Sequence, residues 1–104
     1  MDISQIKNTP GVYIIQSQKN SRYYIGSTDN IKNRLKYHNS GWVKATRLAQ
    51  PWEIKFFQIC PNTAMAKQIE IQLKKLKRRD YIEGIIKEQK IRGKIAQLVM
   101  STPT

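Results

Sequence analysis

The fold is decided by residues 11–26, which read Gly11-Val-Tyr-Ile-Ile-Gln-Ser-Gln-Lys-Asn-Ser-Arg-Tyr-Tyr-Ile-Gly26. Residues 12–15 and 23–25 are β-branched or aromatic, and such residues favour strands. The polar segment 19–21 between the two runs has the composition of a hairpin loop. The stretch therefore predicts two antiparallel strands joined by a short turn.

A tyrosine stands close to the glycine at the outer end of each run, since Tyr13 follows Gly11 and Tyr24 precedes Gly26. A glycine there can adopt positive φ, or let a backbone or a phosphate approach where a Cβ would clash. Two phenols on neighbouring strands are therefore expected near one spot. The alternative is that both tyrosines only pack, which is the usual role of aromatic residues in hairpins.

Size and charge indicate one small domain with a polyanionic partner. The 104 residues suffice for one modest core, so we expect a single domain over residues 1–104. Nineteen Lys and Arg against seven Asp and Glu give a net charge of +12 and a pI near 10.1. No apolar run approaches the roughly 18 residues of a membrane-spanning helix. Nucleic acid is therefore favoured over a membrane as the partner.

The N-terminal residues and the Cys and His content indicate the cellular compartment and the kind of metal site that the chain can form. The first ten residues lack the features of a signal peptide, so we expect a cytoplasmic protein. The single cysteine, Cys60, excludes an internal disulfide and is interpreted as a small buried residue at a strand end. With one Cys and one His, a zinc site of the Cys/His type is not available. A bound metal is expected to be a hard cation on oxygen ligands.

A helix is predicted directly after the hairpin. Residues 27–30 offer N-cap candidates for a helix over 31–38, and residues 39–41 offer its stop. Arg34 and His38 are four residues apart and therefore share one edge of this helix.

The remaining chain predicts one more strand and further helices. The segment 42–49 is expected to be a loop or a short helix, and residues 52–59 a third strand. The longest helix is expected over residues 64–79, with Glu70 at the edge of its buried face. That face comprises Met65, Ala66, Ile69, Leu73 and Leu76.

The C-terminal part predicts additional helical structure. Asp80 and Glu83 are spaced as a capping box for a helix that directs Ile82, Ile85 and Ile86 inward. Residues 90–99 predict a further amphipathic turn or two, and residues 101–104 a frayed end. We expect a small α/β (α+β) fold, a three-stranded antiparallel or mixed sheet flanked by helices in β-β-α-β-α order with an extra C-terminal helix.

Several short patterns, in this order and spacing, resemble the GIY-YIG endonuclease family. They are Gly11-Val12-Tyr13, Tyr24-Ile25-Gly26, Gly26-Ser27-Thr28, Arg34-x-x-x-His38-Asn39, Pro51-Trp52-Glu53 and Ala66-x-x-x-Glu70. Val12 stands where the family has its first Ile. The resemblance covers about residues 10–80, leaves about 81–100 as a helical extension, and is closest to small stand-alone members and the nuclease half of the UvrC type. It implies a three-stranded sheet surrounded by helices and a metal-dependent endonuclease.

The resemblance places Tyr13, Tyr24, Arg34 and Glu70 at the positions of the family's active site. Phosphodiester hydrolysis needs a nucleophilic water, neutralisation of charge on phosphate oxygens and help for the leaving oxygen. Glu70 is suited to hold one Mg²⁺ or Mn²⁺, and Arg34 to bind the scissile phosphate. Either tyrosine, with a pKa lowered by nearby cations, is a candidate base, and His38 is a second candidate for proton transfer.

Each of these residues also has a structural interpretation. Arg34 could be a solvated charge on a helix face, and Glu70 a plain partner of Lys74 worth roughly 0.3 to 0.5 kcal/mol. His38 could end its helix favourably against the helix dipole.

The predicted function is an endonuclease acting on DNA, selective for DNA structure or directed by a protein partner, in repair or recombination. Basic residues expected to bind nucleic acid near the site are Lys32, Lys36, Lys44 and Arg47. RNA remains open as a substrate, and the oligomeric state is not determined. The first alternative is a non-catalytic basic nucleic-acid-binding module. The second is a structural protein with an acidic partner.

Overall fold

A three-stranded antiparallel sheet forms the centre of the computed structural model, which describes residues 2–100. The strands are β1 (Gly11–Ser17), β2 (Tyr23–Thr28) and β3 (Trp52–Ile59), in the order β2-β1-β3. The central strand β1 pairs antiparallel with both neighbours, so β2 and β3 are the edge strands. The predicted hairpin and third strand are confirmed, and the sheet is purely antiparallel.

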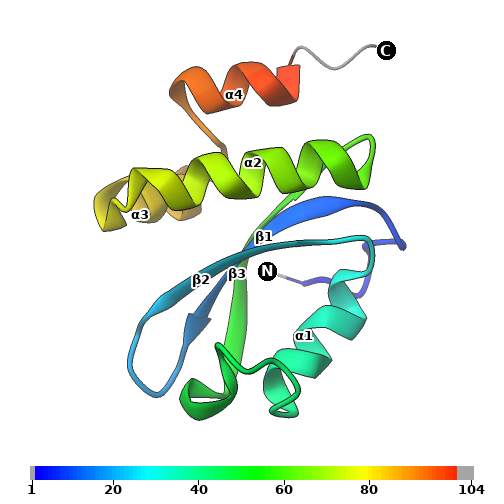
Figure 1. Ribbon diagram of the computed structural model, residues 1–104, viewed down its shortest axis with the longest axis vertical. Helices are drawn as coiled ribbons and strands as arrows, with labels where there is room; N and C mark the ends of the chain where they lie inside the picture. Colours follow the sequence, from blue (N-terminus) through cyan, green and yellow to red (C-terminus); the bar gives the residue numbers. More distant parts are fainter. Residues whose placement is uncertain (1, 101–104) are drawn as a thin grey trace.

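Helices cover both faces of the sheet, as Figure 1 shows. One face carries α1 (Ile31–Asn39), and the short 3-10 helix Arg47–Ala49 follows it in the chain. The other face carries α2 (Thr63–Leu76) and α3 (Arg79–Glu88), and α4 (Gly93–Met100) packs against α2 on the side away from the sheet. The β-β-α-β-α order is confirmed, and α3 and α4 form where a further helix and an additional amphipathic turn or two were predicted. No helix among residues 2–100 is long and apolar enough to cross a membrane.

The alternation of side chains along β1 divides the core into two parts. Val12 and Ile14 face α2, where they pack with Phe56, Ile69 and Leu73. The other core contains Tyr13, Ile15, Ile31, Trp52 and Ile54 on the side of α1. Tyr13 is therefore a core residue of the α1 side, and Cys60 at the end of β3 is buried, as predicted.

Gly26 is required because the phenol of Tyr13 crosses directly over it. The two residues are partners across the β1–β2 pair, and a Cβ on Gly26 would overlap the hydroxyl end of the Tyr13 ring. A Cβ on Gly11 would overlap the Phe57 ring in the same way. The glycines of the hairpin therefore make room for aromatic side chains, a role that differs from the positive φ and from the backbone or phosphate approach expected of them.

Asparagine side chains begin two of the helices. Asn30 accepts a hydrogen bond from the Asn33 amide at 3.1 Å at the start of α1, and Asn62 accepts one from the Met65 amide at 2.8 Å at the start of α2. The end of α1 is held to the sheet by Asn39, whose side chain pairs with the backbone of Trp52 at 2.6 and 3.0 Å. These bonds fix the helix that carries Arg34 and His38.

Three predictions about the C-terminal half are wrong. The longest helix ends at Leu76 instead of residue 79, because Lys77 adopts a left-handed conformation with φ of 49°. Leu76 is exposed rather than buried. The capping box does not form, because the N-cap of α3 is Arg78, two residues before Asp80, and Asp80 pairs with Arg78 at 2.7 Å. The prediction for residues 101–104 lies outside the described residues.

Candidate active site

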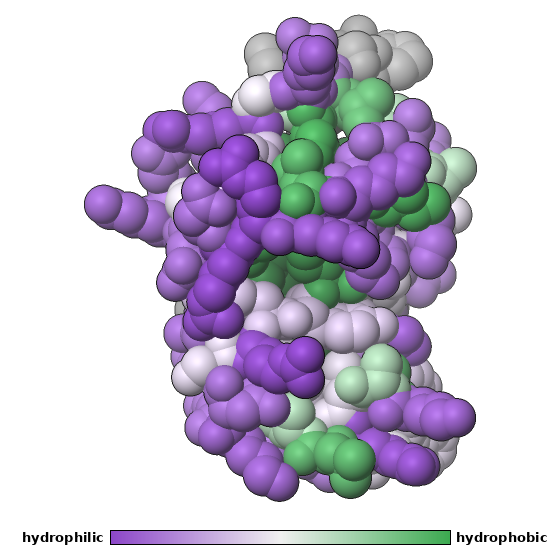
Figure 2. Space-filling model, turned by 60° about the vertical axis from the view of Figure 1, so that its left-hand side comes forward, coloured by the Kyte–Doolittle hydropathy of each residue, from purple (hydrophilic) through white to green (hydrophobic). Residues whose placement is uncertain are grey.

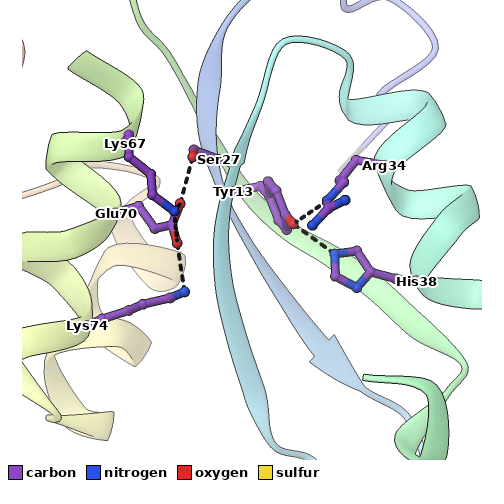
Figure 3. Close-up of polar contacts among 7 residues, drawn as sticks. All are labelled: Tyr13, Ser27, Arg34, His38, Lys67, Glu70 and Lys74. Atoms are coloured by element: carbon purple, nitrogen blue, oxygen red, sulfur yellow. Dashed lines mark hydrogen bonds and ion pairs between the residues drawn. The ribbon is translucent and has the colours of Figure 1, made fainter. Parts of the chain in front are cut away.

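The predicted site residues form two groups, one on each side of the edge strand β2 (Figure 3). The α1-side cluster consists of Tyr13, Tyr24, Arg34, His38 and Thr46. The α2-side cluster consists of Ser27, Lys67, Glu70 and Lys74. Alternation along β2 causes this division, because Tyr24 packs with the core on the α1 side while Ser27 contacts α2.

The hydroxyl of Tyr13 connects Arg34 with His38. It accepts a hydrogen bond from Arg34 Nε at 3.3 Å and lies 2.7 Å from His38 Nε2. Since Arg34 can only donate, the Tyr13 proton is left for the imidazole nitrogen. The shared helix edge predicted for Arg34 and His38 thus brings both side chains to one phenol.

Thr46 completes this chain of hydrogen bonds behind His38. Its hydroxyl lies 2.7 Å from His38 Nδ1 and donates to the Val43 carbonyl at 3.4 Å, so Nδ1 carries the proton and donates to Thr46. Trp52 Nε1 donates to the Thr46 carbonyl at 2.8 Å. His38 and Thr46 are both fully buried. This arrangement assigns His38 as a neutral imidazole whose Nε2 accepts from Tyr13.

The pKa values of this cluster differ from those expected. Burial, with a smaller effect of the Arg34 charge, lowers the pKa of His38 to about 4. Burial raises the pKa of Tyr13 to about 12 although Arg34 acts in the opposite direction. The expectation that cations lower the phenol pKa is therefore wrong for Tyr13. A charged His38 at the helix end is likewise excluded near neutral pH.

Tyr24 is the phenol that a substrate can reach. Tyr13 is 0% exposed, whereas Tyr24 is half-buried at the edge strand. The Tyr24 ring lies edge-on to the imidazole of His38, with 5.0 Å between ring centroids. Arg34 is also half-buried, and a hydrogen bond with Tyr13, followed by smaller effects of Tyr24, raises its pKa. Arg34 and Tyr24 therefore present a permanent cation and a phenol to the solvent.

Glu70 is more than a surface partner of Lys74. Its side chain is 6% exposed, and Oε1 accepts a hydrogen bond from the Ser27 hydroxyl at 2.6 Å. Oε2 pairs with Lys74 Nζ at 2.7 Å, and Lys67 Nζ lies 3.5 Å from both oxygens. Burial raises the pKa of Glu70, but Lys74, Ser27 and Lys67 together outweigh that effect and lower it. Glu70 is therefore an ionised, buried carboxylate fixed to β2.

The donor atoms around Glu70 fit a hard divalent cation. Residues 2–98 contain no group of three or more His, Cys, Asp and Glu side chains placed to hold a metal. Mg²⁺ and Mn²⁺ retain most of their water, so one carboxylate with the Ser27 hydroxyl beside it suffices. Lys67 and Lys74, whose side chains are 61% and 44% exposed, would have to move away from Glu70 when a cation binds.

Within the described part of the chain, the side chains of the basic residues predicted to bind nucleic acid form no hydrogen bond or ion pair with these clusters and lie outside the hollows along β2. Lys32 and Lys36 are exposed and line a hollow on α1 together with residues 2–4. Lys44 and Arg47 are exposed in the segment before β3. None of these four lines the hollows that border β2.

The sequence assigned no role to Ser27, Thr46 or Lys67, and it offered Lys74 only as an ion-pair partner of Glu70. The spacings of Lys67 and Lys74 from Glu70 place all three on one helix edge, so their contact was available from the sequence. Ser27 belongs to a pattern already noted but had no role assigned. Thr46 lies in a segment without periodicity, and only the fold brings it to His38.

Comparison with known proteins agrees with this geometry. A match to the GIY-YIG catalytic domain covers residues 9–84, and domains of this class are nucleases that act on DNA. The chain therefore belongs to the GIY-YIG family.

Similar curated proteins are named as UPF0213 proteins. One from Clostridium perfringens is 35% identical over 75 residues, covering 71% of this chain and 80% of the relative. One from Bacillus cereus is 34% identical over 74 residues, covering 70% and 76%. YazA of Bacillus subtilis is 35% identical over 75 residues, covering 68% and 75%. No solved structure matches the chain with significance.

Proposed function

We propose that this protein is a divalent-metal-dependent endonuclease that hydrolyses phosphodiester bonds in DNA, selects its target by DNA structure or through a protein partner, and serves repair or recombination. One observation carries the proposal. A buried, ionised Glu70 stands on one side of the edge strand β2, and a substrate-accessible arginine and phenol stand on the other. A phosphodiester lying across β2 would contact both clusters.

In the proposed reaction a water attacks the phosphorus, the bond to the 3′ oxygen breaks, and negative charge grows on the nonbridging oxygens. Arg34 binds these oxygens with its fork of N–H groups and neutralises their charge. Tyr13 is buried and acts through Arg34, because its hydroxyl holds the Nε end of the guanidinium. The arrangement leaves the other guanidinium nitrogens for the phosphate.

We assign Tyr24 as the group that holds the attacking water and receives its proton. Tyr24 is the more exposed phenol and can hold a water by hydrogen bonding. The buried His38, whose pKa is lowered to about 4 and whose Nε2 already accepts from Tyr13, stays neutral and positions Tyr13. Glu70 is the residue that would hold Mg²⁺ or Mn²⁺. When bound, the cation supplies charge neutralisation and lowers the pKa of water.

The test incubates purified protein with labelled duplex, flap, branched and single-stranded DNA, and with RNA of matching sequence, in Mg²⁺, Mn²⁺ or EDTA. We expect cleavage of DNA that requires the metal and differs among the DNA structures. Absence of cleavage of every DNA in both metals would refute the proposal. Cleavage of RNA alone would reassign the substrate.

A second candidate function has one observation in its favour. Lys67 and Lys74 already neutralise Glu70, which is the arrangement of a structural ion pair in a basic binding module. Such a module binds DNA in a salt-dependent way and leaves it uncut, so the same incubation separates the two functions.

A further inference from the structure

A groove runs between the start of β2 and the junction of α2 with α3, beside the α2-side cluster. Its volume is about 550 Å³, within the usual range for ligand sites. Five basic residues line it, namely Arg22, Lys74, Lys77, Arg78 and Arg79. Its apolar lining consists of Ile25, Leu73 and Ile82. We call this the β2–α3 groove. Figure 2 shows the side of the molecule that carries it, where hydrophilic side chains border a hollow with hydrophobic surface inside.

The groove has an excess of positive charge. No acidic residue lines it. Lys74 pairs with Glu70 and Arg78 with Asp80, both at 2.7 Å, and Arg79 lies 3.8 Å from Glu83. Among residues 2–98, no carboxylate lies within ion-pair distance of Arg22 or Lys77. The charge suits a chain of phosphates.

Flat side chains lie beside this charge. The guanidinium of Arg79 lies over the ring of Tyr23, 4.6 Å from its centroid, and donates a hydrogen bond to the Ser21 carbonyl at 3.1 Å. An arginine stacked on a tyrosine presents a flat cationic surface, and nucleic-acid bases stack on such surfaces irrespective of sequence. The combination of apolar lining, stacked arginine and cationic rim suits nucleotides whose bases are unpaired.

The groove is continuous with the candidate site. Lys74 lines it and also contacts both Glu70 and the ring of Tyr24, whose centroid lies 5.3 Å from Nζ. A second hollow, lined by Ser27, Arg34 and Lys67 among others, lies at the other end of β2. The six residues of β2 span about 20 Å, which corresponds to about six nucleotides of a stacked DNA strand at 3.4 Å each, and to fewer when the strand is extended.

We propose that the β2–α3 groove binds an unpaired DNA strand that continues from the scissile phosphate. The phosphates lie on the cationic rim, and a base lies against the apolar lining and the Arg79–Tyr23 pair. A base inside a duplex is paired and stacked, and cannot reach this lining. The inference rests on the proposed function and specifies its substrate as DNA with a single-stranded segment next to the cleavage site.

The test measures binding in EDTA by fluorescence anisotropy, so that it does not depend on cleavage. The probes are a blunt duplex and the same duplex with a six-nucleotide single-stranded extension. The groove variant is Lys77→Gln with Arg79→Gln. The matched control is Lys75→Gln with Lys87→Gln, which removes two exposed charges outside the groove. Thermal melting checks that both variants fold.

We expect the wild type to bind the extended duplex more tightly than the blunt one. In the groove variant the slope of log affinity against log salt should fall by about 1.4, since each single-strand phosphate contact contributes about 0.7. At 0.1 M salt, one log unit below 1 M, a slope lower by about 1.4 corresponds to a roughly 25-fold weaker affinity for the extended duplex. The control should retain most of the wild-type preference.

A further variant tests the stacking. Arg79→Lys keeps the charge but removes the flat guanidinium, so affinity for the extended duplex should fall while the salt slope stays unchanged. Equal wild-type affinity for both probes, or equal weakening in the groove variant and the control, would overturn the proposal. Loss of cleavage on all DNA with the binding preference intact would instead refute the nuclease function alone.

Discussion

The two clusters beside β2 differ in how they hold their charges. The α1-side cluster is built from buried, neutral groups that satisfy one another, with Arg34 as its one permanent cation. The α2-side cluster holds a buried carboxylate with two lysines whose side chains are largely exposed. Packing and mutual hydrogen bonds hold the α1-side cluster in place. In the α2-side cluster, the exposed lysines could move away from Glu70. The neutral hydrogen-bonded groups and the carboxylate with its ion pairs therefore lie on opposite sides of β2.

The largest effect is expected at Glu70. Glu70→Gln keeps the size of the side chain and its acceptor for Ser27 but removes the charge that would hold a cation. Cleavage should fall on the order of a thousandfold, while DNA binding persists or tightens because a negative group is lost near phosphate. Single-turnover cleavage and anisotropy measure the two effects.

The matched control is Glu53→Gln, which removes an exposed carboxylate paired with Lys55 at 3.3 Å. It should cleave at the normal rate. If Glu70→Gln also cleaves normally in Mg²⁺ and loses at most about 0.5 kcal/mol of stability, Glu70 is only an ion-pair partner.

Arg34→Ala tests the opposite cluster and should fail differently. It removes a phosphate contact and stabilisation of the transition state, so cleavage should drop on the order of a few hundredfold and affinity should weaken as well. Arg34→Lys keeps the charge without the forked geometry and should recover binding better than cleavage. Normal turnover by Arg34→Ala would make it a solvated helix-face charge.

His38 should make the stability of the α1-side cluster depend on pH. Its pKa is about 4 when folded against an ordinary value of 6.5, so between these values the unfolded chain binds more protons. Stability is therefore fully present above pH 6.5 and is lost as pH falls. The loss between pH 7 and pH 5 should be about 2 kcal/mol.

Urea unfolding of the wild type and of His38→Gln at the two pH values measures this dependence. The difference between the pH dependence of the wild type and that of His38→Gln gives the contribution of the imidazole alone, because the carboxylates contribute equally to both proteins. An identical pH dependence in both proteins would show that His38 is not held neutral by its burial.

The smallest effects separate the two tyrosines. Tyr13→Phe leaves His38 Nε2 without its donor in the core, which should cost about 1 to 2 kcal/mol of stability as well as lowering cleavage. Tyr24→Phe should leave stability nearly unchanged and lower cleavage, because its half-buried ring keeps its packing. Thermal unfolding and single-turnover assays on both variants give the comparison. If both phenylalanine variants cleave DNA at the wild-type rate, the two tyrosines contribute to packing and not to catalysis.

Local patterns alone predicted a large part of the fold. The β-branched and aromatic runs around a polar loop predicted the hairpin, and the N-cap candidates in residues 27–30 marked the start of α1. Helical spacing also predicted that Arg34 and His38 share one edge. The boundaries near residues 77–80 were missed, because a left-handed Lys77 and an Arg78–Asp80 pair determine them and neither has a clear sequence signal.

The sequence by itself determined the order of elements, the positive charge and the family to which the chain belongs. Only the tertiary structure decided how deep each group lies and which distant groups meet. Burial raises the pKa of Tyr13, where a count of nearby cations predicts the reverse, and Thr46 reaches His38 from a segment without periodicity. The β2–α3 groove likewise joins residues from two distant segments. Periodicity specifies the face of an element, whereas a pKa, a hydrogen-bond partner and a groove depend on what the rest of the chain packs against that face.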